Sequence, residues 1–224
     1  MATRLYLVRH GATQLSAEDR FAGEVDVLLS NAGLDQARRL GRRLSGETIS
    51  AVYASPMKRT IATAEQVAKE HNLPVQTMPE LREIAHGRWE GRTRAEVEKE
   101  FSEEYARWEE DPFSFAPVGG ESGLQVTARA LPALLQLVER HKDQRFVVVS
   151  HKATIRLLLS SLLGFDPRKY RDRLDQNPAG LNILDFKDAA HPRLTLFNDI
   201  SHYDSDVPEM PSRRLSKTWS GTEK

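Results

Sequence analysis

The segment at positions 145–150, RFVVVS, constrains the fold more than any other part of the chain. Its apolar residues follow one another without polar alternation, which is typical of a strand buried on both faces of a parallel sheet. Parallel neighbours need long crossover connections, and helices usually supply them. The segment therefore predicts an α/β protein with a largely parallel central sheet.

The rest of the chain shows the alternation of strands and helices that this class requires. Segment 33–44 has the apolar spacing of an amphipathic helix, and Ser30 or Asn31 could cap it. Pro132 is a candidate kink in a later helix, and Gly164 ends the last one. Strands are predicted over 4–8, 49–54, 73–78, 145–150, 181–186 and 193–198, and helices over 33–44, 57–71, 94–101, 103–110, 122–141 and 153–163.

Charge and cysteine content exclude several classes of protein. The 224 residues include 32 Lys and Arg, 32 Asp and Glu, and no cysteine. Zero net charge gives no general attraction to nucleic acid or to an anionic membrane, and no apolar run approaches the roughly 18 residues of a membrane span. Without cysteine there is no disulfide, thiolate metal site or cysteine nucleophile. We therefore expect a soluble, cytoplasmic protein without a nucleic-acid or membrane partner.

We expect a single domain over residues 1–203, because no boundary for a second domain is evident. The stretch at about 81–120 is irregular and rich in turn residues near its end, which predicts a cap-like insertion. Residues 204–224 are polar and contain serine and proline, which is typical of a tail outside the domain.

Polar side chains follow several predicted strands at the point where each strand ends. Arg9 and His10 follow the first strand, Arg59 lies just beyond the second, and His151 follows the valine strand. Ligands bind at the carboxyl ends of strands in open α/β sheets, so these side chains are expected to converge. Each alone is more often structural than catalytic, and the prediction depends on their combination.

The chemistry of this set points to phosphoryl transfer. Arginine guanidinium groups match phosphate oxygens in pairs, and a neutral imidazole nitrogen can attack phosphorus. A second histidine can donate hydrogen bonds to the developing charge. Glu83 lies in the irregular insertion that could overhang the site, where a carboxylic acid can protonate the leaving oxygen and later activate water.

The sequence resembles the histidine phosphatase superfamily, which includes the cofactor-dependent phosphoglycerate mutases. The motifs that carry the resemblance are LVRHGAT at 7–13, LLSNAGLDQA at 28–37, YASPMKRT at 53–60, LREI at 81–84 with GRWEG at 87–91, GGES at 119–122 and VVSH at 148–151. They occur in the family's order and cover nearly the whole chain from about residue 4 to 203.

The resemblance implies a role for each matching residue. His10 is the expected nucleophile, and Glu83 is the expected proton donor and then base. Arg9, Arg59 and His151 form the expected phosphate pocket. It also implies a three-layer α/β/α sandwich and a reaction without a metal ion or other cofactor.

The sequence departs from the family pattern at two positions near the site. Ser16 stands where many members have an asparagine that helps to bind phosphate, and its hydroxyl could offer the contact instead. Lys152 stands where a glycine commonly follows the second histidine. The Lys152 side chain either points away from the site or brings its ammonium to an anionic substrate.

The length of the insertion favours a phosphatase over a mutase. Glu83 and His151 are 68 positions apart, whereas the mutases carry a longer insertion that excludes water from the bisphosphate. The expected substrate is a small phosphorylated metabolite. A mutase that uses 2,3-bisphosphoglycerate, a sugar-phosphate phosphatase, a phosphate-binding protein without activity and a histidine-based metallohydrolase remain the alternatives.

Further segments resemble the bacterial metal-independent phosphoserine phosphatases, namely EIAHGRW at 83–89, RW at 107–108 and NDISH at 198–202. The resemblance makes phosphoserine the first candidate substrate. It also makes His86 either a residue near the polar end of the substrate or a packing residue in the loop. Because those enzymes are dimers, a homodimer is expected.

Overall fold

A computed structural model describes residues 2–17 and 20–203 of the chain. Its centre is a six-stranded sheet with the order β3-β2-β4-β1-β5-β6. The strands in chain order are β1 (Thr3–Arg9), β2 (Ala51–Ala54), β3 (Val75–Thr77), β4 (Arg145–Ser150), β5 (Leu181–Phe186) and β6 (Pro192–Asp199). The fold is the α/β fold that the sequence predicts.

The sheet is parallel from β3 to β1 and antiparallel at its other edge. β2 pairs in parallel with β3 and β4, and β4 pairs in parallel with β1. β5 is antiparallel to both β1 and β6. Segment 187–191 is too short for the crossover that a parallel β5–β6 pair would need. The carboxyl ends of β1, β2 and β4 therefore share one edge of the sheet.

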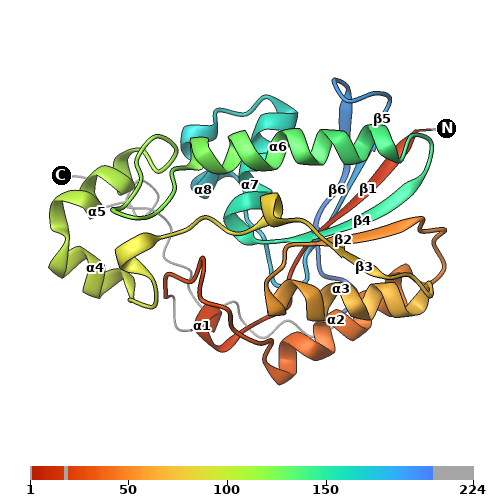
Figure 1. Ribbon diagram of the computed structural model, residues 1–224, viewed down its shortest axis with the longest axis horizontal. Helices are drawn as coiled ribbons and strands as arrows, with labels where there is room; N and C mark the ends of the chain where they lie inside the picture. Colours follow the sequence, from red (N-terminus) through yellow and green to blue (C-terminus); the bar gives the residue numbers. More distant parts are fainter. Residues whose placement is uncertain (1, 18–19, 204–224) are drawn as a thin grey trace.

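Helices cover both faces of the sheet, as predicted (Figure 1). Helices α2 (Asn31–Leu44) and α3 (Lys58–Glu70) cover one face, and α6 (Gly123–Arg140) and α7 (Lys152–Leu163) cover the other. Successive strand residues point to opposite faces, so Val147 and Val149 pack toward α2 and α3. Phe146 and Val148 pack toward α6 and α7. This burial on both faces explains the run of valines.

Local signals set the helix ends. The Ser30 hydroxyl accepts a hydrogen bond from the backbone of Gly33 and caps α2, and Ser122 with Gln125 forms a capping box at α6. Gly164 has φ 71° and ends α7 in the left-handed conformation that favours glycine. Helix α6 continues through Pro132.

Segment 81–120 lies beyond the carboxyl ends of the strands and contains α4 (Arg94–Glu100) and α5 (Ser102–Glu110), at the left of Figure 1. These helices have an aromatic cluster of their own, made by Phe21, Trp89, Val97, Tyr105 and Trp108. The predicted tail at 204–224 lies outside the described residues. Elements that the sequence analysis did not predict are α1 (Gln14–Ala17), η1 (Pro79–Leu81), η2 (Gly87–Trp89), η3 (Pro167–Lys169) and α8 (Tyr170–Arg173).

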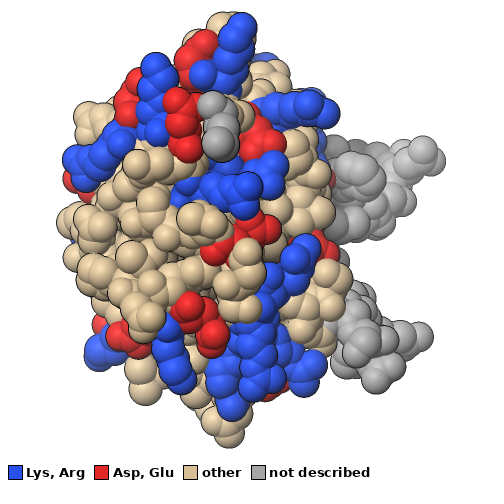
Figure 2. Space-filling view, turned by 90° about the vertical axis from the view of Figure 1, so that its right-hand side faces the viewer, with Lys and Arg blue, Asp and Glu red and all other residues tan. Residues whose placement is uncertain are grey.

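The end of the sheet opposite these helices carries paired charges. Arg4 donates two hydrogen bonds to Asp185, at 2.7 and 2.9 Å, and Arg145 pairs with Glu47. Figure 2 shows this side of the molecule, with basic and acidic side chains interspersed. Among the described residues, no helix is both long enough and apolar enough to cross a membrane.

Candidate active site

The strand ends bring the predicted chemical groups to one pocket. Arg9 ends β1 and His10 follows it, while His151 follows β4 and Arg59 lies in the first turn of α3. The pocket has a volume of about 190 Å³, and its wall includes Arg9, His10, Arg59 and Glu83. The ring of His151 lies edge-on to that of His10, with 5.2 Å between the centroids.

The surroundings of His10 fix the state of its imidazole. Its Nδ1 lies 2.7 Å from the carbonyl oxygen of Gly11, which can only accept, so Nδ1 carries the proton. Burial, together with Arg9 and Arg59, holds the pKa of His10 well below its ordinary value. The ring is therefore neutral near pH 7, and Nε2 keeps a lone pair at the pocket.

Gly11 places His10 by close packing against α2. A Cβ on Gly11 would lie 2.5 Å from the carbonyl oxygen of Gly33, and a Cβ on Gly33 would lie 2.1 Å from that of Ala12. No side chain fits at either position without moving the backbone. The two glycines therefore hold the loop after β1 directly on the first turn of α2.

Arg59 is held by the loop at residues 22–25. Its Nη1 donates to the carbonyl of Val25 at 2.7 Å and its Nη2 to that of Gly23 at 2.9 Å. Glu90 holds the same loop in place, because its carboxylate accepts hydrogen bonds from the backbone N–H groups of Gly23 and His86. Burial raises the pKa of Glu90. Glu90 lies within the GRWEG motif at 87–91, but the sequence predicted no role for it.

His151 is fully buried, and both of its ring nitrogens contact other side chains. The Nε of Arg59 donates to its Nδ1 at 3.3 Å, so the proton of the neutral ring is on Nε2, which lies 2.8 Å from the Ser55 hydroxyl oxygen. Burial and the nearby His10, Arg59 and Arg9 lower the pKa of His151. In this state both ring nitrogens are engaged, and the expected role of His151 in the phosphate pocket stays a prediction.

Glu83 lies at the amino end of α7. Its carboxylate accepts hydrogen bonds from the backbone N–H groups of Ile84, Ala153 and Thr154 and from the Thr154 hydroxyl, at 3.0–3.2 Å. These four donors fix its orientation at the pocket wall. The helix that begins just after His151 therefore places Glu83 in the same pocket as His10.

The remaining predicted residues differ in how well they are placed. His86 lines the pocket and packs edge-on against Phe21 at 4.8 Å, and burial with Arg94 and Arg171 lowers its pKa to about 3. Lys152 also lines the pocket, with its ammonium 3.9 Å from the carboxylate of Asp175. The Ser16 side chain lies outside the described part of the structure, so its role stays a prediction.

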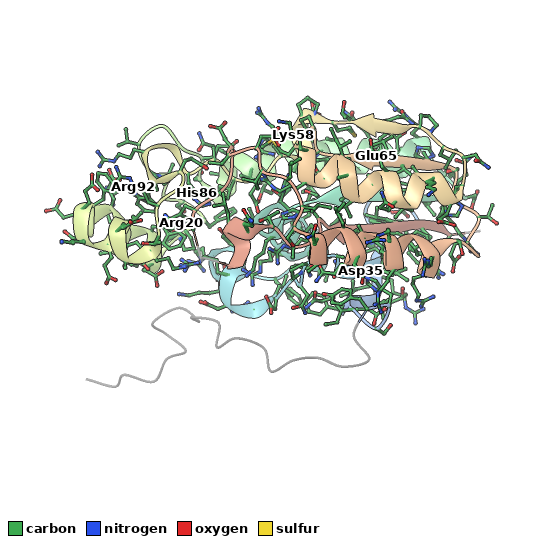
Figure 3. All side chains as sticks on the ribbon, turned by 90° about the horizontal axis from the view of Figure 1, so that it is seen from below. Arg20, Asp35, Lys58, Glu65, His86 and Arg92 are labelled. Atoms are coloured by element: carbon green, nitrogen blue, oxygen red, sulfur yellow. The ribbon has the colours of Figure 1, made fainter. Side chains whose placement is uncertain are left out.

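Sequence reasoning missed much of the pocket wall. Figure 3 shows Arg20 on the cap side of the molecule together with His86. Helix α8 was not predicted, because its four residues are too few to show a helical periodicity. The sequence did contain a signal for Arg156, because this residue follows Lys152 by four positions and so lies on the same face of the helix. The additional wall residues include Arg20, Arg94, Trp108, Arg156, Tyr170 and Arg171.

The lining residues give the pocket an excess of cations. Among the described residues of the wall, seven are Lys or Arg, and Glu83 is the one carboxylate. A cleft lined by one sign of charge attracts ligands of the other sign. Within residues 2–17 and 20–203, no three His, Cys, Asp or Glu side chains are grouped as ligands for a metal ion.

Comparison with known proteins identifies the family. Residues 5–200 match the Histidine phosphatase superfamily (branch 1). The chain belongs to this superfamily. The family that the sequence motifs predict is thus confirmed, and with it the assignment of this histidine phosphatase to the phosphoric monoester hydrolases.

Known relatives of this histidine phosphatase are named for different substrates. Phosphoserine phosphatase 1 of Hydrogenobacter thermophilus is 38% identical over 167 residues, which cover 75% of this chain and 79% of that protein. Adenosylcobalamin/alpha-ribazole phosphatase of Escherichia coli is 33% identical over 174 residues, 77% of this chain and 86% of that protein. The structure of Bacillus stearothermophilus YhfR superposes with a TM-score of 0.84 at 30% identity and covers 90% of this chain and 99% of its own. The class of reaction is thus shared, whereas the substrate varies.

Proposed function

We propose that this histidine phosphatase hydrolyses a small phosphomonoester through a phosphohistidine on His10, without a metal ion. The observation that carries the proposal is the 2.7 Å contact from Nδ1 of His10 to the Gly11 carbonyl. It fixes the tautomer whose Nε2 lone pair lies at the pocket, beside Arg9 and Arg59. A neutral imidazole with an available nitrogen is the state that nucleophilic attack requires.

In the first step, Nε2 of His10 forms a bond to phosphorus while the bond to the leaving oxygen breaks. Arg9 and Arg59 neutralise charge on the oxygens of the transferred group. The Glu83 carboxylate must first take up a proton, which it then donates to the leaving oxygen, so the alcohol departs neutral. The ring of His151 lies 5.2 Å from that of His10, and the expected role of His151 in the phosphate pocket stays a prediction.

In the second step, water attacks phosphorus on the side that the alcohol has left. The Glu83 carboxylate takes a proton from this water, and the phosphorus–nitrogen bond to His10 breaks. Inorganic phosphate leaves, and both residues return to their starting protonation states. Atoms and charge balance without a metal or an organic cofactor.

Phosphoserine is the first candidate substrate. The proposal is supported by the 38% identical relative from Hydrogenobacter thermophilus, which is named phosphoserine phosphatase 1. It is also supported by the position of His86 in the wall of the pocket that contains His10. A panel of phosphoserine, 3-phosphoglycerate, sugar phosphates and p-nitrophenyl phosphate, assayed with EDTA, tests both the substrate and the absence of a metal. Preference for a different panel member would replace phosphoserine, and loss of activity in EDTA would contradict a metal-free reaction.

Trapping the intermediate tests the mechanism itself. Brief reaction with a ³²P-labelled substrate, followed by denaturation, should leave label that is stable in alkali and lost in acid, as a phosphohistidine requires. The label should be absent from His10→Ala. Label on another residue would contradict the assignment, and isomerisation of 3-phosphoglycerate without phosphate release would favour the mutase alternative. The expected homodimer stays a prediction that light scattering on the purified protein tests.

A further inference from the structure

The segment that carries Glu83 has little regular structure of its own. Residues 82–86 lie between η1 and η2 and belong to no helix or strand, so many of their backbone groups need hydrogen-bond partners from other segments. The segment passes beside α6 on its way from β3 to the cap, and η1 packs against that helix (Figure 1). The placement of Glu83 therefore depends on side chains that α6 and its neighbours supply.

Arg129 of α6 binds three backbone carbonyls of this segment. Its Nη1 donates to the carbonyls of Glu80 and Arg82, at 2.6 and 3.0 Å, and its Nη2 donates to that of Glu83 at 3.0 Å. Its Nε and Nη2 also donate to the two carboxylate oxygens of Glu121, both at 2.8 Å. These five hydrogen bonds use all five N–H donors of the guanidinium. Arg129 is not part of the described pocket wall, so its donors serve the protein and not a ligand.

Glu121 completes this arrangement just before α6 begins. It pairs with Arg129 through both of its oxygens, and the same carboxylate accepts a hydrogen bond from the backbone N–H of Ala85 at 3.1 Å. The backbone N–H of Glu121 donates in turn to the carbonyl of Ala85 at 2.8 Å. The side chains of Arg129 and Glu121 are only 18% and 24% exposed. The two residues therefore hold the main chain at Glu83 itself and on either side of it.

The carboxylate of Glu83 is held by a different helix. Backbone N–H groups of Ala153 and Thr154, in the first turn of α7, donate to it. Helix α6 thus sets the position of the main chain of Glu83, and α7 sets the position of its carboxylate. A general acid must come within hydrogen-bond distance of the leaving oxygen, and a misplacement of about 1 Å can lower the rate about 10²-fold.

We propose that Arg129, held by Glu121, is a positioning residue for proton transfer by Glu83. It acts through the backbone of Glu83 and does not touch the substrate. The inference rests on the proposed phosphatase function, in which Glu83 protonates the leaving oxygen, and adds to that step a residue outside the pocket.

The ratio of kcat/KM values for two kinds of substrate tests the proposal, because kcat/KM reports formation of the phosphohistidine. In Arg129→Met, kcat/KM for the preferred alkyl phosphate should fall about 10-fold or more, since the acid is displaced. The fall should be much smaller for p-nitrophenyl phosphate, whose leaving group needs no proton. If Arg129 only stabilised the fold, both values would fall by the same factor, and that outcome would overturn the inference.

The Glu83→Gln background tests whether Arg129 acts through Glu83. Once the acid is removed, the placement of residue 83 no longer affects protonation of the leaving group. Adding Arg129→Met to Glu83→Gln should therefore lower kcat/KM for the alkyl phosphate by less than about 2-fold further. A loss by the same factor in both backgrounds would show that Arg129 acts independently of Glu83 and would overturn the inference.

Arg140→Met is the matched control, because Arg140 lies exposed in the last turn of the same helix and should leave the substrate ratio unchanged. Circular dichroism and the urea midpoint check that each variant is folded. If Arg129→Met does not fold, Arg129→Lys takes its place, since it keeps the charge but has three donors in place of five. Its substrate ratio should also fall, and a wild-type ratio in this variant would overturn the inference.

The same assays separate this inference from the proposed function. A selective loss with the alkyl phosphate in Glu83→Gln, without one in the Arg129 variant, would overturn the role of Arg129 and leave the proposed function intact. An equal loss with both substrates in Glu83→Gln would overturn the acid role of Glu83, and the inference with it.

Discussion

The two ends of the sheet use the same kinds of side chain in opposite ways. At the end away from the cap, His141 is held on both ring nitrogens, by the Tyr53 hydroxyl at 2.9 Å and by the Gln144 side chain at 3.0 Å. At the pocket end, Nδ1 of His10 is bonded, and Nε2 has no hydrogen bond to any described residue. One histidine completes a polar network within the protein, whereas the other presents a nitrogen to a ligand.

The charged residues at the two ends differ in the same way. Arg4 faces Asp185, and Arg145 faces Glu47, so each cation at the far end has its own acid. The described pocket wall instead combines seven cations with one carboxylate, and five of these cations share three acids that lie outside the wall, Glu96, Glu109 and Asp175. Groups that satisfy one another add modest stability, whereas an excess of one sign in a cleft costs stability and becomes useful when a ligand supplies the opposite charge.

The largest expected effect comes from replacing each of these two histidines in turn. His10→Ala should lower kcat by about 10³-fold or more, because the nucleophile is lost, while the urea midpoint changes little. His141→Gln should leave kcat near that of the wild type but lower the free energy of unfolding by about 1–3 kcal/mol, because buried partners lose hydrogen bonds. Substantial turnover by His10→Ala would contradict the contrast between the two ends.

Glu83→Gln should produce the next largest effect. It keeps the shape of the side chain and removes the proton donor, so kcat for an alkyl phosphate should fall roughly 10²-fold or more. The loss should be smaller for p-nitrophenyl phosphate, whose leaving group needs no proton. Stopped assays with both substrates measure the difference, and an equal loss with the two would argue that Glu83 only supports the structure.

The dependence of stability on pH should distinguish the pocket histidines from exposed ones. The folded pKa of His86, about 3, lies below its ordinary value, so the unfolded chain binds more protons as the pH falls. Its contribution to stability is therefore complete above about pH 6.5 and is lost below it, by at most about 1.4 kcal/mol per pH unit.

Urea unfolding near pH 7.5 and near pH 5 measures this loss. His86→Gln should show a smaller decrease in the free energy of unfolding than the wild type. His191→Gln, in which the side chain is 71% exposed, should keep the decrease of the wild type. Identical decreases in the two variants would mean that His86 is not linked to stability in this way.

The smallest effect is expected at the charge pairs of the far end. Arg4→Met should lower the free energy of unfolding by about 1 kcal/mol or less, since partly exposed ion pairs contribute little. The side chain of Arg4 is 32% exposed and that of Asp185 22%. Chemical denaturation measures the change, and kcat should remain that of the wild type. A large loss of kcat would show that the two ends are coupled.

The sequence predicted the parts of the molecule that strong local patterns specify. The valine strand, the capped α2 and the glycine end of α7 lie where expected, because buried runs and helix caps act over a few residues. The four residues of α8 escaped prediction, since so short an element shows no periodicity. The strand at 181–186 was predicted, but its antiparallel direction was not, because pairing direction depends on long-range contacts.

The same distinction applies to the site. Arg9, His10, Arg59 and Glu83 were predictable from strand ends and motifs, and they line one pocket. The residues that contact these side chains and set their protonation states were not predictable, because they come from distant segments of the chain. The contact of His151 with Ser55, 96 positions away, follows from the order of β2 and β4 in the sheet, which no local pattern specifies.

The aromatic cluster beneath α4 and α5 has an evolutionary consequence. Because this cluster is separate from the two that cover the sheet, mutations in the cap can accumulate without disturbing the strands that carry His10 and His151. New specificities can then arise in one segment while the reaction is inherited unaltered. Exchange of the α4 and α5 segment, residues 94–110, between related enzymes is accordingly a practical route to altered selectivity, provided that the partners of Trp108 and Glu109 on α8 move with it.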